Sequence, residues 1–133
     1  MPEPGPARPA PAGPTVEPRR VAILADDLIW STRLADAVTA AGGVPVRVRR
    51  LDDLYAALAG ADLAIVDLTA RAYDPRRAIA EAAARARVLA VGQHDGAELR
   101  RAALAAGAER VLAYRKLFED GPAILRAWLM DTG

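Results

Sequence analysis

Short apolar runs alternate with longer amphipathic segments from about residue 20 to the end of the chain. Such short, continuous apolar runs are typical of strands that are buried on both faces of a sheet. The second run contains Pro45, which has no amide hydrogen to donate to a central ladder, so we place this strand at a sheet edge. The five predicted strands are 21–25, 44–48, 63–68, 88–92 and 111–114.

After each run, apolar residues recur every three or four positions, which predicts a helix. The first helix covers about 29–41 and ends at the glycine pair that begins with Gly42, because glycine is favoured at helix C-termini. Asp74 and Pro75 fit the N-cap and the first position of the third helix, and the fourth begins at or near Asp95. The other helical stripes are Leu51, Leu54 and Leu58, then Leu99, Ala102, Ala103 and Ala106, and finally Ile124, Leu125, Trp128 and Leu129.

Five strand–helix units in regular alternation predict an α/β fold with a parallel sheet and helices on both faces. Eight units would be needed for a closed barrel. We therefore expect an open, doubly wound, flavodoxin-like sheet with strand order 2-1-3-4-5, in which the proline-containing strand is an edge. In such sheets the functional site lies beyond the carboxyl ends of the strands, near the switch point between strands one and three.

The first 18 residues differ in composition from the rest of the chain, because they hold seven of its ten prolines. Such a segment buries too little apolar surface to offset the entropy of ordering it. We predict a disordered, proline-rich tail over 1–18 and one domain over 19–133. No apolar segment follows Met1 as in a signal peptide, and no run of about 18 apolar residues occurs. We therefore expect a cytoplasmic protein without a membrane partner.

Composition excludes several classes of function. The chain has 18 basic and 17 acidic residues, so its net charge of +1 gives no electrostatic case for nucleic acid or an anionic membrane. The absence of Cys excludes disulfides, a zinc ribbon and a thiol nucleophile. The single His excludes a metal site with two imidazoles. No glycine-rich phosphate loop and no nucleophile elbow occur, so we expect that the protein is not an enzyme.

Chemically suggestive side chains follow four of the predicted strands. Asp26 and Asp27 follow the first, Asp67 closes the third, His94 follows the fourth, and Lys116 follows the fifth. Clustered carboxylates repel one another unless a cation lies among them, and Mg²⁺ with oxygen ligands fits that need. A metal ion and an ammonium around a remaining carboxylate also suit phosphoryl transfer. Each Asp alone has a structural explanation, such as Asp27 as an N-cap, so the argument rests on their combination.

Over residues 20–130 the chain resembles the receiver domain of two-component response regulators, the CheY-like family. The similar segments are ILADD, AIVDL and AAGAERVLAYRKLF, at 23–27, 64–68 and 105–118. Receivers carry an acidic pair after the first strand, an acceptor Asp at the end of the third, and Lys-x-Phe after the fifth. Lys116 and Phe118 match the last of these motifs.

This resemblance implies a site and its partners. Asp26 and Asp27 would hold Mg²⁺, together with Asp67 and the Thr69 carbonyl. Asp67 would accept a phosphoryl group from a histidine kinase, and Lys116 would pair with that group. No output domain fits in 133 residues, so the readout would be contact with a downstream protein. The family also allows a homodimer.

Other positions depart from the receiver pattern. Gly92 stands where receivers have Ser or Thr, and Ala113 stands where they have the switch aromatic, although Tyr114 is adjacent. Leu117 and Arg71 replace two family prolines. A ligand shifts a conformational equilibrium only through contacts that differ between the two states, and the usual contacts are missing here. The pattern indicates an atypical receiver or pseudo-receiver; the alternative is a small-molecule-binding module on the same fold.

Two further residues are candidates for an accessory role. Trp30 follows the acidic pair and would cover the site or provide an interaction surface. We favour a third interpretation, an ordinary core or rim aromatic of the first helix. His94 would replace the missing hydroxyl as a phosphate or metal contact, although a solvated loop His is more common.

Overall fold

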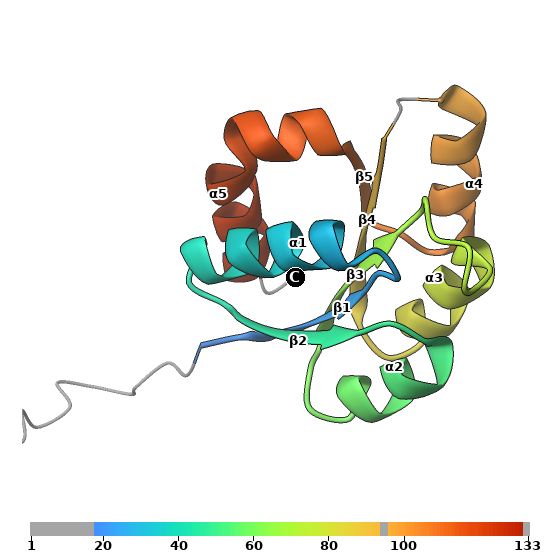
Figure 1. Ribbon diagram of the computed structural model, residues 1–133, viewed down its shortest axis with the longest axis horizontal. Helices are drawn as coiled ribbons and strands as arrows, with labels where there is room; N and C mark the ends of the chain where they lie inside the picture. Colours follow the sequence, from blue (N-terminus) through green and yellow to red (C-terminus); the bar gives the residue numbers. More distant parts are fainter. Residues whose placement is uncertain (1–17, 94–95, 132–133) are drawn as a thin grey trace, which may run out of the picture.

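The computed structural model describes residues 18–93 and 96–131, which form a five-stranded parallel sheet between two layers of helices (Figure 1). The strand order is β2-β1-β3-β4-β5, so the predicted fold class and order are confirmed. Pro45 lies on the edge strand, as expected. The elements are β1 (Arg20–Leu24), α1 (Leu28–Ala40), β2 (Val44–Val48), α2 (Leu51–Leu58), β3 (Leu63–Asp67), α3 (Pro75–Ala83), β4 (Arg87–Gly92), α4 (Ala97–Ala106), β5 (Arg110–Ala113) and α5 (Tyr114–Met130).

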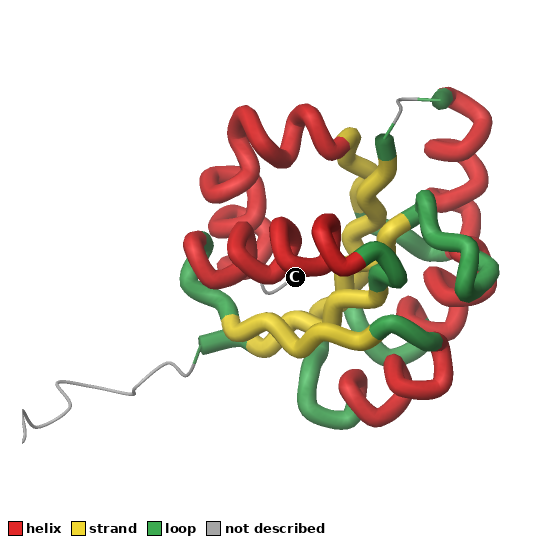
Figure 2. The backbone as a smooth tube through the Cα atoms, in the orientation of Figure 1, coloured by secondary structure: helices red, strands yellow, loops and turns green. Residues whose placement is uncertain are grey.

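The sheet is buried on both faces because each has its own layer of helices. Successive strand residues point to opposite faces. Val21 and Ile23 face α1 and α5, whereas Ala22 and Leu24 face α2, α3 and α4. Figure 2 shows the same division, with α1 and α5 on one side of the sheet and the other helices on the far side. Two apolar cores thus fix the strands, and with them the edge where the strands end.

The parallel register brings the carboxyl ends of the inner strands to one edge. Leu24 lies beside Val66, and Asp67 lies beside Val91. On the far side of β4, Gly92 pairs with Ala113. The segments that follow β1, β3, β4 and β5 therefore start from the same edge, as the sequence predicted.

The β5–α5 junction differs from the prediction. Tyr114, expected in the strand, is the first residue of α5, so Lys116 lies in a helix rather than in a loop. Buried residues recur at helical spacing from Tyr114 through Leu117 into the rest of α5, and this favours the early start. The helix bends at Asp120, where the backbone leaves helical geometry two residues before Pro122.

Helix ends follow the predicted chemistry where the structure describes them. The Asp74 carboxylate accepts a hydrogen bond from the Arg76 amide at 3.0 Å, which confirms it as the N-cap of α3. The fourth helix is preceded by Gly96, and Asp95 lies outside the described residues. Gly107 ends α4 with φ +126°, and a Cβ there would lie only 2.6 Å from the Ala83 Cβ. Glycine at this position lets α3 and α4 approach closely.

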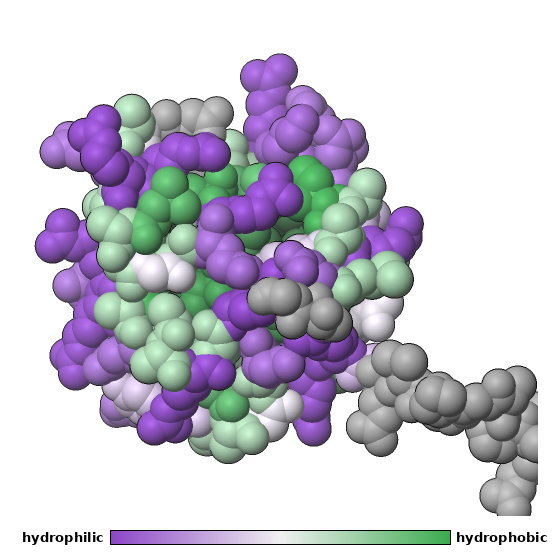
Figure 3. Space-filling model, turned by 180° about the vertical axis from the view of Figure 1, so that it is seen from behind, coloured by the Kyte–Doolittle hydropathy of each residue, from purple (hydrophilic) through white to green (hydrophobic). Residues whose placement is uncertain are grey.

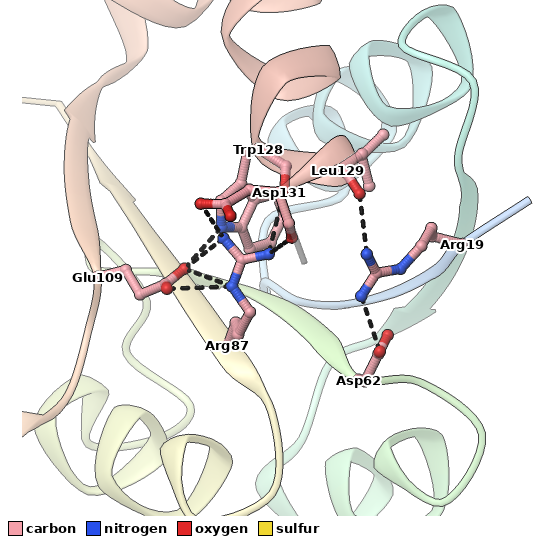
Figure 4. A network of polar contacts seen from close by, with 7 residues as sticks. All are labelled: Arg19, Asp62, Arg87, Glu109, Trp128, Leu129 and Asp131. Atoms are coloured by element: carbon pink, nitrogen blue, oxygen red, sulfur yellow. Dashed lines mark hydrogen bonds and ion pairs between the residues drawn. The ribbon is translucent and has the colours of Figure 1, made fainter. Parts of the chain in front are cut away.

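A polar network fastens the opposite edge of the sheet (Figure 4). The Arg87 guanidinium at the start of β4 donates to both carboxylate oxygens of Glu109 at 3.0 Å and lies over the Trp128 ring. The Trp128 indole also donates to Glu109, at 3.0 Å. Nearby, Arg19 forms a 2.7 Å ion pair with Asp62. The end of α5 is thereby tied to the sheet, far from the edge where the strands end.

Surface apolar side chains are scattered. On the face in Figure 3, hydrophobic residues are separated by hydrophilic ones. The most exposed large apolar side chains are Leu28 and Ile29 at the start of α1 and Met130 at the end of α5. Among the described helices, none combines the length and apolar character needed to cross a membrane.

Candidate functional site

Asp67, the last residue of β3, is the buried centre of the candidate site. Its side chain is completely shielded from solvent. Oδ1 accepts two hydrogen bonds from Thr69, from the amide at 2.9 Å and the hydroxyl at 2.8 Å. Oδ2 has no hydrogen-bond partner among the described residues. One half of the carboxylate is therefore capped by the chain that follows it, while the other half lacks a donor.

Tyr114 is a neighbour of this carboxylate. Its hydroxyl is also buried without a hydrogen-bond partner in the described chain. Burial raises the pKa of this phenol, and the neighbouring Asp67 carboxylate raises it further through its charge and a side-chain hydrogen-bonding interaction. The two groups are thus near each other, although no hydrogen bond of ordinary geometry joins them. From the sequence, Tyr114 was placed in the last strand and considered only as the neighbour of Ala113. The helical spacing of Tyr114, Leu117 and Leu125 is the pattern that could have indicated its inward position.

Tyr114 belongs to an aromatic layer of three stacked rings, together with Trp30 and Phe118. Trp30 stacks on Tyr114 with ring centroids 3.8 Å apart, and Phe118 stacks on Trp30 at 5.5 Å. The Arg33 guanidinium lies over two of these rings, 5.1 Å from the centre of Phe118 and 5.5 Å from that of Trp30. Trp30 is partly buried and packs against the core, as expected for a rim aromatic of the first helix.

The acidic pair is engaged in structural hydrogen bonds. Asp27 accepts from the Trp30 amide at 3.0 Å and is the N-cap of α1. Asp26 Oδ2 accepts from two consecutive amides of the β3–α3 loop, those of Arg71 at 2.9 Å and Ala72 at 3.0 Å. The cap of Asp27 was anticipated. The tie from Asp26 to Arg71 and Ala72, 45 and 46 residues along the chain, was not, because it depends on how a distant loop folds back.

Tyr73 closes the same loop from within. It is 9% exposed, and its hydroxyl lies 2.9 Å from the Leu24 carbonyl and 2.8 Å from the Asp67 carbonyl. Burial raises its pKa, and the Asp67 and Asp26 carboxylates raise it further. A second buried phenol therefore lies beside the acidic residues, and its hydroxyl proton, unlike that of Tyr114, has carbonyl acceptors within hydrogen-bond distance.

Lys116 follows β5 as predicted, but its charged partner is Asp120 rather than the acidic residues at the other strand ends. Its ammonium is 3.0 Å from Asp120 Oδ2 on the same helix, and the side chain is more than half exposed. No ion pair among the described residues joins it to Asp26, Asp27 or Asp67. Because α5 begins at Tyr114, the residue two positions later projects about 200° further round the helix axis. The aromatic therefore points inward, and the lysine points away.

The carboxylates expected to hold Mg²⁺ each have one oxygen engaged by the protein itself. No three acidic or imidazole side chains in the described part of the chain are grouped as ligands to one metal ion. Asp26 Oδ2, one Asp27 oxygen and Asp67 Oδ1 already accept hydrogen bonds from the protein. The Thr69 amide and hydroxyl are turned toward Asp67. His94 lies outside the described residues.

The missing hydroxyl at Gly92 is not imposed by lack of space. A Cβ there would meet the Leu68 side chain at 3.5 Å, an ordinary van der Waals distance. Next to it, Gln93 lines a pocket of about 420 Å³ together with Asp27, Trp30 and Thr69. An open pocket thus lies beside Trp30 of the aromatic layer, and Asp67 is not among the residues that line it.

Comparisons with known proteins identify the fold. No protein-family model and no curated protein matches the sequence. A CheY-like response regulator receiver domain from Methanospirillum hungatei matches with TM-score 0.67 and 17% identity, over 84% of this chain and 96% of that one. The BeF3-activated receiver domain of Klebsiella pneumoniae RstA matches with TM-score 0.74 and 17% identity, over 85% and 100%. An atypical orphan response regulator matches with TM-score 0.64 and 19% identity, over 86% and 98%.

The chain accordingly has the fold of CheY-like receiver domains over most of its length. At these identities the likeness concerns the fold, and the role of each site residue has to be argued from its own contacts.

Proposed function

We propose that this chain is a receiver-fold signalling module that acts through contacts with a partner protein, independently of phosphorylation at Asp67. The observation that carries the proposal is the state of the Asp67 carboxylate. It is fully buried, it accepts hydrogen bonds from Thr69, and its neighbour Tyr114 stacks on Trp30. A phosphodonor reaches a fully buried carboxylate only after the side chains around it move.

The electrostatics around Asp67 support the same conclusion. Phosphoryl transfer needs cations beside the transferring oxygens and an accessible nucleophile. Lys116 is paired with Asp120, and Asp26 is held by the Arg71 and Ala72 amides. Gly92 offers no hydroxyl to a phosphoryl oxygen. Neither a phosphorylated state nor a metal-bound state thus has the contacts that would favour it over the present one.

The structural neighbours supply a precedent. The atypical orphan regulator with this fold is described as having a phosphorylation-independent regulatory mechanism, whereas the RstA receiver was solved as its BeF3-activated form. We place the present chain with the first of these. Its partner would be a downstream signalling protein. A histidine kinase would bind the chain without transferring a phosphoryl group to it. A cytoplasmic location and a homodimer stay predictions.

Treatment with a phosphodonor tests the proposal. The full chain is incubated with Mg²⁺ and acetyl phosphate, followed by intact mass, and with Mg²⁺ and beryllofluoride, followed by amide NMR. We expect no added phosphoryl mass and no saturable shifts around Asp67. Asp67→Asn is the matched control, since it removes the acceptor and keeps the size. A mass gain or shifts that occur in the wild type and vanish in Asp67→Asn would overturn the proposal.

A variant that restores the hydroxyl of the family pattern tests whether burial or the missing hydroxyl prevents phosphorylation. Gly92→Ser restores the family hydroxyl at a position with room for a Cβ. If the buried carboxylate is the obstacle, Gly92→Ser alone stays unmodified. Phosphorylation of Gly92→Ser would instead show that the absent hydroxyl alone limits the reaction, and would contradict the role given to burial.

A further inference from the structure

A cavity beside the edge strand gathers three arginines. It lies where β2 runs into α2 and has a volume of about 570 Å³, within the range of ordinary small-ligand sites. Arg47, Arg49 and Arg50 line it, together with the carboxylates of Asp26 and Asp53. Open doubly wound sheets bind ligands at this carboxyl edge, so the cavity lies on the side of the fold where a ligand is expected.

The charge of these arginines is not neutralised by ion pairs. Arg47, Arg49 and Arg50 share this lack of ion pairs with other arginines of the described chain, and differ from them in that they line one cavity together. No described ion pair involves Arg47, Arg49 or Arg50. Asp26, although it lines the cavity, gives its Oδ2 to the backbone amides of the β3–α3 loop. Unpaired cations that converge in a concave site concentrate positive potential there and attract anions.

Two of the guanidinium groups are held in place. Arg47 Nε donates to the Ser31 hydroxyl at 2.9 Å, and its Nη2 donates to the Thr32 hydroxyl at 3.0 Å. The anchoring Ser31 is only 2% exposed. Arg49 Nη2 donates to the Asp26 carbonyl at 3.3 Å. A guanidinium carries five N–H donors, so each anchored group keeps donors for a ligand, and part of the entropy of ordering it is already lost.

We propose that this cavity binds a small ligand through its phosphoryl group, with Arg47, Arg49 and Arg50 as the anion-recognising residues. Planar guanidinium groups bind phosphate oxygens in pairs, and a tetrahedral, multiply charged phosphoryl group can engage more than one of them at once. A single carboxylate offers only one such pair of oxygens. The balanced total charge of the chain argues against a nucleic-acid backbone as the occupant. This inference does not rest on the proposed function.

Titration of the full chain with pyrophosphate, followed by amide and arginine side-chain NMR, tests the site. We expect saturable shifts at Ser31 and across 47–53. Arg50→Gln should weaken binding at least about tenfold, as for loss of one charged hydrogen bond. No side-chain hydrogen bond of Arg50 to the described residues is lost, so the fold should be kept. Arg47→Gln is the second variant, and Arg115→Gln, distant in the sequence and paired with Glu119, is the control.

Three results would overturn the site as proposed. Shifts that do not saturate, or that weaken equally in Arg50→Gln and Arg115→Gln, would indicate general charge attraction only. Malonate binding as tightly as pyrophosphate would remove the preference for phosphoryl groups. Tighter binding of a short DNA duplex than of pyrophosphate at physiological salt would replace the small ligand with a nucleic acid.

Discussion

The Tyr114 hydroxyl faces the Asp67 carboxylate at the carboxyl edge of the sheet, and each has a buried oxygen without a hydrogen-bond partner in the described chain. A buried polar atom left unsatisfied costs about 1–3 kcal/mol, so this arrangement persists because neighbouring contacts hold it. The stack of Trp30 on Tyr114 is one such contact. These two unsatisfied oxygens lower the stability of the folded chain at this site.

Removal of the orphan hydroxyl should therefore cost nothing. We expect Tyr114→Phe to leave the free energy of unfolding unchanged or to raise it by up to about 1 kcal/mol, because the ring stack stays and an unsatisfied group goes. Tyr73→Phe is the matched comparison, since its hydroxyl is bonded to the Leu24 and Asp67 carbonyls. It should lower the free energy of unfolding by about 1–3 kcal/mol. Urea unfolding measures both; equal losses would contradict the orphan status of Tyr114.

The two buried phenols predict a loss of stability in alkali. Burial raises the pKa of both Tyr73 and Tyr114 above the ordinary phenol value of 10.0. Above that pH the unfolded chain releases protons that the folded chain retains, so unfolding becomes more favourable. Each phenol should contribute a decrease of up to about 1.4 kcal/mol per pH unit. Below pH 10 their contribution should be fully present.

Urea unfolding between pH 8 and 11.5 measures this slope. The Tyr114→Phe variant lacks one of the two groups, so its stability should fall less steeply than that of the wild type. The same slope in both proteins would show that Tyr114 titrates normally in the folded state.

The acidic pair should separate into two structural roles. Asp27→Ala removes the N-cap of α1 and should lower the free energy of unfolding by about 1 kcal/mol. Asp26→Ala leaves the Arg71 and Ala72 amides without their acceptor, and the loss should be about 1–3 kcal/mol. Hydrogen exchange distinguishes the two, because Arg71 and Ala72 should exchange faster only in Asp26→Ala. Unchanged protection there would refute the loop tie.

The Arg87 network should be worth more than an exposed ion pair. Arg87 is mostly buried and joins Glu109 to the end of α5, and its hydrogen bond holds the pKa of Glu109 below its ordinary value. Arg87→Ala should lower the free energy of unfolding by about 2–3 kcal/mol. Arg77→Ala removes an exposed pair with Glu81 and should change it by about 0.5 kcal/mol or less. Thermal and urea unfolding compare them, and similar losses would mean that the network adds nothing.

Local patterns were sufficient to predict the sheet and its order. The runs at 21–25 and 63–68 are apolar because both faces of their strands are covered, and strand–helix alternation leaves few ways to connect them. Pro45 marked the edge through its missing donor. The roles of Asp74 and Asp27 as helix caps could also be predicted from the sequence, because an N-cap side chain bonds an amide within three residues of itself.

The prediction of the site was less complete, because it depended on helix phase and on a distant loop. From the sequence, Lys116 was placed opposite the acidic residues by its position after the last strand. In the structure α5 begins at Tyr114, two residues before Lys116. The lysine therefore pairs with Asp120, and Tyr114 lies beside Asp67. No local pattern showed that the Arg71 and Ala72 amides would take up Asp26.

The sequence by itself determined the order of the elements, the parallel sheet and the edge where charged residues collect, since these follow from apolar periodicity and chain connection. Only the tertiary structure decided which charged groups at that edge meet, because this depends on the residue at which α5 begins and on contacts between residues some 45 positions apart. For that reason Asp67 lies beside Tyr114 of the aromatic layer and Lys116 pairs with Asp120, and three arginines of the β2–α2 segment line one cavity.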